Sequence, residues 1–98
     1  MIIVNAFIEL KEDKVQDFMK SAEKLVEETR KEEGCIFYTL YADPKNSRKL
    51  VMVEVWASRP AFDLHITLPH FLEHVKEVKD MLAVPTELKL YEAKEIQL

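Results

Sequence analysis

Glycine is almost absent from this chain, since Gly34 is the only one among its 98 residues. Loops that hold phosphate groups or dinucleotides through backbone N–H groups need several glycines at fixed spacing. The chain has no such loop and no serine-centred nucleophile elbow. This scarcity excludes most of the glycine-rich loops that bind nucleotide-type cofactors.

Cysteine is as scarce as glycine, with Cys35 as the single representative. One thiol cannot form an internal disulfide, which is typical of a reducing compartment, so we expect a cytoplasmic protein. No base or second cysteine stands beside Cys35 in the sequence. We therefore interpret it as a small buried hydrophobe and not as a nucleophile.

Long apolar runs and an excess of positive charge are also missing. No run approaches the roughly 20 residues of a membrane span, and the N-terminus has no signal-peptide pattern. The chain has 18 acidic and 14 basic residues and a net charge of −4, with alternating signs along the predicted helices. This pattern argues against nucleic acid and against a membrane surface as partners, and the length indicates a single domain over residues 1–98.

The periodicity of the apolar residues predicts four strands and two main helices. We expect strands over residues 2–9, 35–42, 48–56 and 86–93, a helix over 13–32, and a second helix that is interrupted at Pro69 and stopped by Pro85. Gly34 follows the first helix, where a C-terminal cap favours positive φ. The order β-α-β-β-α-β predicts an α+β, ferredoxin-like fold with two helices on one face of an antiparallel sheet.

Every predicted strand has apolar residues on both of its faces. Two helices can cover only one face of a four-stranded sheet, and a large bare apolar face is unusual for a soluble monomer. A twofold partner would bury that face against its own copy. We therefore predict a homodimer that packs sheet against sheet.

The segment from Glu54 to Phe71 gathers most of the candidate site residues at one strand-to-helix corner. Such corners tend to line a cleft, and polar groups set among aromatic ones are candidate site residues. The candidates here are a carboxylate, an indole, two imidazoles and two phenyl rings: Glu54, Trp56, His65, His70, Phe62 and Phe71.

Asn5 of the first strand is a further candidate, and it shares with Glu54 and Trp56 both a structural and a functional interpretation. Asn5 is either a solvent-facing or locally satisfied amide, or a donor to a ligand. Glu54 is either hydrated at the sheet margin, or paired with His65, whose imidazole it would orient. Trp56 is either a core residue or a flat surface on which a ring-shaped ligand stacks.

The three histidines differ in the roles that they can be given. His70 and His74 are spaced i, i+4, which could hold a metal, but no third ligand is in register, so we expect no metal site. His70 otherwise caps the helix or lies in solvent, and His74 is a satisfied core histidine. His65 precedes the Pro69 break and is the best candidate for a general base, since an ordinary imidazole pKa near 6.5 suits proton transfer at neutral pH.

The segments EEGCIFYTLYADP, EVWAS and AFDLHITLPHF resemble the antibiotic-biosynthesis-monooxygenase-like family, especially its quinol monooxygenase and autoinducer-2-processing isomerase types. The most specific element is H-x-x-x-P-H-[FMY], formed by His65, Pro69, His70 and Phe71. The resemblance implies a dimeric α+β barrel with one pocket per subunit between sheet and helices. It also implies oxidation of a phenolic or quinol substrate without flavin, haem or metal.

The first hypothesis is therefore a cofactor-independent monooxygenase that oxidises a small aromatic or quinone-like substrate with O2. In it His65 is the base, Asn5 donates to the substrate oxygen and Glu54 orients His65. The substrate-binding residues are Trp56, Phe62, His70 and Phe71.

Two alternatives stay open at this point. The first is an isomerase of a small polar metabolite, phosphorylated or not, in which His65 moves protons between adjacent carbons; for a phosphorylated substrate, Arg59 is the one basic residue near the expected pocket. The second is a dimer that binds a small molecule without catalysis.

Overall fold

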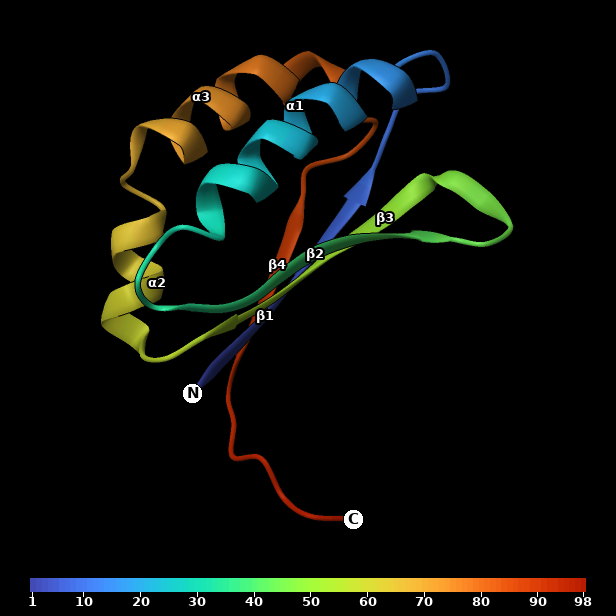
Figure 1. The fold of residues 1–98 in the computed structure, drawn as a ribbon. Helices are drawn as coiled ribbons and strands as arrows, with labels where there is room; N and C mark the ends of the chain where they lie inside the picture. The colour runs from blue at the N-terminus through green and yellow to red at the C-terminus, as the bar shows by residue number, and fades with distance from the viewer.

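The computed structural model describes residues 1–98 as a four-stranded sheet with one layer of helices on one side (Figure 1). The elements are β1 (Ile2–Glu9), α1 (Val15–Thr29), β2 (Cys35–Asp43), β3 (Asn46–Trp56), α2 (Arg59–His65), α3 (Pro69–Val78), the 3-10 turn η1 (Lys79–Met81) and β4 (Glu87–Glu92). The strand order is β2-β3-β1-β4, with every neighbouring pair antiparallel. The predicted α+β, ferredoxin-like arrangement is confirmed.

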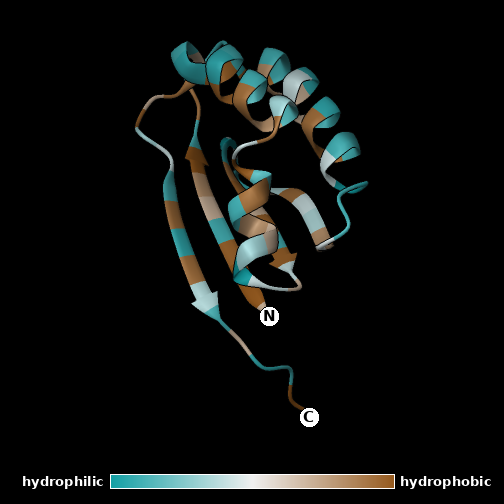
Figure 2. Ribbon diagram, turned by 90° about the vertical axis from the view of Figure 1, so that its left-hand side faces the viewer, coloured by the Kyte–Doolittle hydropathy of each residue, from teal (hydrophilic) through white to brown (hydrophobic).

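One face of the sheet forms the core together with the helices. Successive side chains of a strand point to opposite faces, so residues that pair across strands share a face. Val4 pairs with Glu54, and Glu54 pairs with Tyr38, and all three are buried under the helices. We call this side the helix face. In Figure 2 the hydropathy colours alternate along the strands and around the turns of the helices, as this two-layer packing requires.

The opposite side of the sheet, which we call the open face, is covered by nothing in the single chain (Figure 1). Its large side chains are substantially exposed, with 43% of Phe7, 50% of Tyr41 and 49% of Tyr91 accessible. The pairing places on it Ile3, Asn5, Phe7, Phe37, Thr39, Tyr41, Val51, Val53, Val55, Glu87, Lys89 and Tyr91. The open face is therefore largely apolar on β1, β2 and β3, as expected, whereas on β4 it carries Glu87 and Lys89 beside Tyr91.

The prediction that Gly34 has a positive φ as a helix cap is wrong. Its φ is not positive, so the glycine is not needed as a left-handed helix cap. A Cβ at this position would lie 2.3 Å from the Cβ of Ala61 in α2. Glycine is required here because α2 passes against the backbone that leads into β2.

The helices are shorter than the periodicity predicted. α1 begins at Val15 and ends at Thr29, and a turn in which Glu32 N–H donates to the Thr29 carbonyl follows it. Glu32 therefore lies in the connection to β2 and not on the helix. Ser58 caps α2 by accepting a hydrogen bond from the Ala61 N–H at 3.2 Å, and Pro69, where the sequence predicts a break, opens α3. None of these helices combines the length and apolar character that crossing a bilayer requires.

Candidate functional site

A cavity of about 370 Å³ lies between the helix face of the sheet and the helices α1 and α3. Of its 15 lining residues, 11 are hydrophobic. Three of the others give it polar groups: Glu54 from β3, His74 from α3, and Thr86 before β4; Tyr38 of β2 also lines it. An apolar cavity with a few convergent polar groups is the usual form of a small-molecule site.

Glu54 is the charged group of this cavity and is only 4% exposed. Its Oε1 accepts a hydrogen bond from Nε1 of Trp56 at 2.9 Å, and no Lys or Arg pairs with it. Burial raises the pKa of Glu54 to about 7, the Trp56 hydrogen bond opposes this, and the charge of Glu32 raises it further. A carboxyl group whose pKa is near 7 can both take up and release a proton at physiological pH.

Tyr38 and His74 are the other titratable groups that line the cavity. Burial, together with the charge of Glu54, raises the pKa of the Tyr38 hydroxyl, so this group stays protonated and can donate a hydrogen bond. Nδ1 of His74 lies 2.8 Å from the hydroxyl of Ser21, and its ring packs edge-on against Phe18. Burial lowers the pKa of His74, which keeps the imidazole neutral at pH 7.

His65 and His70 form a separate cluster with Glu32. Oε2 of Glu32 lies 2.7 Å from Nδ1 of His65 and 2.7 Å from Nε2 of His70. Since an ionised carboxylate only accepts hydrogen bonds, both ring nitrogens are donors to it. Burial lowers the pKa of His65, against the opposing effect of Glu32.

The side chain of His65 is enclosed by aromatic rings and is 1% exposed. Its ring centroid lies 4.7 Å from that of Trp56, 5.0 Å from that of Phe71 and 5.4 Å from that of Tyr38. Nε2 of His65 has no hydrogen-bond partner and is buried. His65 does not line the cavity, but Tyr38 and Phe71, whose rings pack against its imidazole, do.

The structure does not assemble the predicted trio of His65, Asn5 and Glu54. Asn5 pairs with Val53 and Lys89 and lies on the open face, whereas Glu54 lies on the helix face. The sheet itself separates the two side chains. In addition, the carboxylate that holds His65 is that of Glu32 and not that of Glu54.

The predicted binding residues are divided between the cavity and the core. Phe71 lines the cavity. Trp56 and Phe62 are 0% and 5% exposed and belong to the hydrophobic core, where their ring centroids lie 6.3 Å apart. His70 is held by Glu32 and does not line the cavity.

Three residues of these two clusters have no site role among the sequence predictions: Glu32, Tyr38 and His74. Glu32 lies in a charged segment at the end of a helix, 33 residues before His65, and no local pattern marks it. Tyr38 falls on the buried face of an apolar strand. His74 was interpreted as a satisfied core histidine; it does have a partner, Ser21, but it also forms part of the cavity wall.

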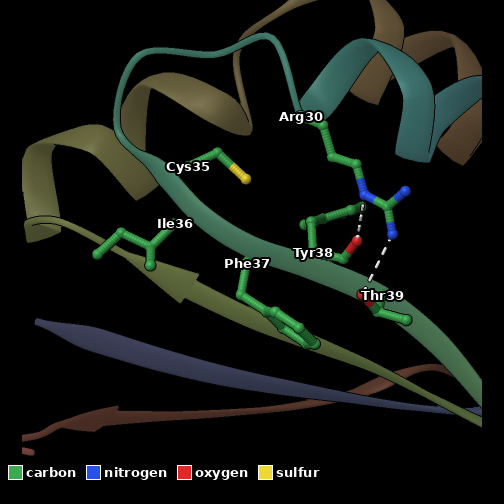
Figure 3. A pocket seen from close by; sticks show the side chains of 6 residues that line it. All are labelled: Arg30, Cys35, Ile36, Phe37, Tyr38 and Thr39. Atoms are coloured by element: carbon green, nitrogen blue, oxygen red, sulfur yellow. Dashed lines mark hydrogen bonds between the residues drawn. The ribbon is translucent and has the colours of Figure 1, made fainter.

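A second hollow of about 350 Å³ lies where α1 ends beside the edge strand β2 (Figure 3). Arg30 reaches over β2, donating from Nε to the Tyr38 carbonyl at 3.0 Å and from Nη2 to the Thr39 hydroxyl at 3.2 Å. Burial raises the pKa of the Cys35 thiol in this wall, which disfavours the reactive thiolate. This hollow therefore offers less acid–base chemistry than the cavity at Glu54.

Comparison with known proteins gives consistent results. The family model described as "Antibiotic biosynthesis monooxygenase" matches residues 1–77. The chain is 38% identical over 96 residues to an uncharacterized protein, sll1783, of Synechocystis, with 98% of this chain and 65% of that protein covered. This chain thus spans slightly less than two thirds of the length of that relative.

Two further proteins are similar to this chain over nearly the whole length of both sequences. The chain is 32% identical over 88 residues to a Bacillus subtilis protein named "Putative monooxygenase YcnE", with 90% of this chain and 93% of that protein covered. A crystal structure of a conserved protein from Methanosarcina mazei superposes with a TM-score of 0.91 at 40% identity, covering 95% and 92% of the two chains. On these findings the chain belongs to the antibiotic biosynthesis monooxygenase family.

Proposed function

We propose that this protein is a cofactor-independent monooxygenase that oxidises a small, electron-rich aromatic substrate, such as a hydroquinone, with O2. The observation that carries the proposal is the buried carboxyl group of Glu54, which has a pKa of about 7 and lies in the wall of an apolar cavity of about 370 Å³. The family membership and the name of the Bacillus subtilis relative support the class of reaction.

The overall reaction needs no external reductant. A hydroquinone and O2 give a hydroxyquinone and water, so that one oxygen atom enters the ring and the other leaves as water. All the electrons come from the aromatic ring. The protein's task is therefore to remove a proton, hold the resulting anion and admit O2.

In this proposal the ionised form of Glu54 removes the proton from a substrate hydroxyl group. The phenolate that forms is electron-rich enough to reduce O2, and a bond then forms between a ring carbon and oxygen. The protonated Glu54 returns its proton to the outer oxygen of the peroxide. The O–O bond then breaks, and the outer oxygen leaves as water with the hydrogen of the attacked ring carbon, which becomes a carbonyl carbon. A carboxyl pKa near the working pH suits both steps.

Tyr38 and His74 position the substrate in this scheme. The protonated Tyr38 hydroxyl can donate a hydrogen bond to the substrate oxygen that becomes charged. His74, held by Ser21, faces the same cavity from α3 and can hydrogen-bond the second hydroxyl group of a hydroquinone. Phe18, Met52 and Phe71 provide apolar walls against which the ring packs.

The isomerase alternative has less support from the geometry. No Lys or Arg lines the cavity, whereas a phosphorylated substrate needs positive charge there. Arg59 is on the outside of α2, where its Nε pairs with Oδ1 of Asp63 at 2.9 Å. The cavity therefore favours an uncharged aromatic molecule.

We also propose that the functional form is a homodimer in which two open faces pack together. The exposed aromatic side chains of that face support this arrangement, and the twofold symmetry lets one apolar surface cover its own copy. The cavity lies on the other side of the sheet, so each chain would keep its own site.

The class of reaction can be tested with purified, metal-stripped protein and a panel of hydroquinones. We expect O2 uptake above the protein-free rate in air and no product without O2. NMR analysis of anaerobic incubations supplies the contrast, because an isomerase would still form product there. Binding to the cavity without turnover in either condition would support the non-catalytic alternative instead.

A further inference from the structure

The cluster of Glu32, His65 and His70 combines three metal-ligating side chains from three separate segments. Glu32 lies between α1 and β2, His65 ends α2, and His70 lies in the first turn of α3. Their ligand atoms all lie within 4.8 Å of one another. Segments far apart in the sequence thus bring two imidazole nitrogens and a carboxylate oxygen to one point.

The charge of Glu32 has no other partner. Its side chain is 11% exposed, no Lys or Arg forms an ion pair with it, and its Oε1 accepts no hydrogen bond. A nearly buried carboxylate needs a compensating positive charge or strong donors. In the structure only the two imidazoles provide this compensation.

We propose that this cluster binds a divalent transition-metal ion, with Oε2 of Glu32, Nδ1 of His65 and Nε2 of His70 as ligands. Two imidazole nitrogens and one carboxylate oxygen suit Zn²⁺, Co²⁺, Ni²⁺ or Fe²⁺ and not the oxygen-preferring Mg²⁺ and Ca²⁺. The cation takes the place of the two N–H protons that now point at the carboxylate, and each imidazole then carries its proton on the other ring nitrogen, Nε2 of His65 and Nδ1 of His70.

The three ligand atoms must rearrange for this. Ligand atoms about 2.0–2.2 Å from a tetrahedral Zn²⁺ lie roughly 3.4 Å apart. In the structure the oxygen lies 2.7 Å from each nitrogen, and the two nitrogens lie within 4.8 Å of each other. The carboxylate must therefore move away from both nitrogens, and the separation between the nitrogens must settle near the same value. The His70 side chain is 19% exposed, so the ion, and water as a fourth ligand, can reach the cluster from solvent.

The proposed ion has a structural role and does not depend on the proposed function. None of the three ligands lines the cavity at Glu54. The ion would instead link the connection between α2 and α3 to the segment that follows α1. Its site would be close to the cavity, because the ring of His65 contacts that of Phe71, which lines the cavity. Metal binding should therefore stabilise the fold rather than supply chemistry.

The test is titration of untagged, chelator-treated protein with Co²⁺ and Zn²⁺. We expect about one Co²⁺ per chain, with the visible absorption of a low-symmetry site, displacement by Zn²⁺ and a higher melting temperature with metal. Glu32→Gln and His70→Gln should lose all three responses. Glu33→Gln is the matched control, because it removes the same charge from the exposed neighbouring residue.

Glutamine is close in size to both glutamate and histidine, so we expect both variants to fold. Circular dichroism of the metal-free variants checks that they do. The proposal is overturned if wild-type protein binds no stoichiometric metal at micromolar concentrations. It is equally overturned if folded Glu32→Gln and His70→Gln bind Co²⁺ as the wild type and Glu33→Gln do, since the ion would then lie elsewhere.

Discussion

Glu54 and Trp56 lie two residues apart on β3, and the indole Nε1 donates to Oε1 of the carboxyl group at 2.9 Å. Both side chains are buried on the helix face, at 4% and 0% exposure. The hydrogen bond holds the carboxyl group in position without adding a positive charge. As a result, burial dominates and the pKa of Glu54 rises to about 7.

The first prediction concerns stability against pH. The folded-state pKa of Glu54 is above its unfolded value of 4.5, so the unfolded chain binds fewer protons between pH 4.5 and about 7. The contribution of Glu54 to the free energy of unfolding is therefore fully present below pH 4.5 and is lost as the pH rises through about 7. This loss amounts to about 3 kcal/mol at 1.36 kcal/mol per unit.

Urea unfolding at several pH values measures this effect as the difference between wild type and Glu54→Gln. The lowered pKa values of His65 and His74 act in the opposite direction, since their contribution rises as the pH increases toward 6.5. Both proteins share this histidine contribution, so it cancels in the difference. An identical pH dependence in the two proteins would mean that Glu54 is not perturbed by burial.

The second prediction separates His74 from His65. His74→Gln removes one hydrogen bond to the substrate and should lower kcat/KM about 3- to 10-fold, as expected for roughly 0.5–1.5 kcal/mol. His65→Ala leaves a void among aromatic rings and should lower the free energy of unfolding by about 2–4 kcal/mol.

Steady-state kinetics and urea unfolding of both variants distinguish the two effects. The change in kcat/KM of folded His65→Ala should stay below roughly tenfold. General-base catalysis contributes about 10²–10⁴-fold, so a loss of that size in folded His65→Ala would restore His65 as the base.

The third prediction concerns the close approach of α2 to Gly34. In Gly34→Ala the new Cβ would lie 2.3 Å from the Cβ of Ala61, so α2 must shift. We expect the free energy of unfolding to fall by about 1–3 kcal/mol, as in other overpacked sites. Ala61→Gly removes the opposing methyl group, and the double variant should recover part of the loss. Strictly additive losses would show that the contact is not the cause.

The fourth prediction concerns the open face. Val53 lies in the middle of this face and pairs with Asn5 and Thr39. If two open faces pack together, dissociation and unfolding are coupled and the melting temperature rises with protein concentration. Val53→Asp should abolish that dependence and lower the melting temperature. Sedimentation of the wild type as a folded monomer at micromolar concentration would contradict the proposed dimer.

The fold could be predicted from the sequence because the relevant patterns are local. The alternation in Ile2–Glu9 and the helical spacing from Val15 to Thr29 each lie within one element, and Pro69 marks the break between α2 and α3. The Gly34 prediction was wrong because the requirement is a tertiary contact with Ala61, which a helix-capping rule does not consider.

The candidate site could be predicted only in part, for a related reason. Glu54 and Phe71 were found because they lie at the strand-to-helix corner, and both line the cavity. Asn5 was assigned to the same site although a period of two places it on the other face of the sheet from Val4 and Glu54. The Glu32–His65 pair joins a loop to a helix end, and only the folded chain shows which carboxylate reaches the imidazole.

The most direct test of the central claim is the pH dependence of O2 uptake by wild type and Glu54→Gln with the best hydroquinone of the panel. We expect kcat/KM of the wild type to rise with pH and to level off above about pH 7, the pKa of Glu54. Glu54→Gln should lose about 10²–10⁴-fold and the pH-dependent rise with it. Equal activity and the same pH profile in both proteins would contradict the role of Glu54 as the base.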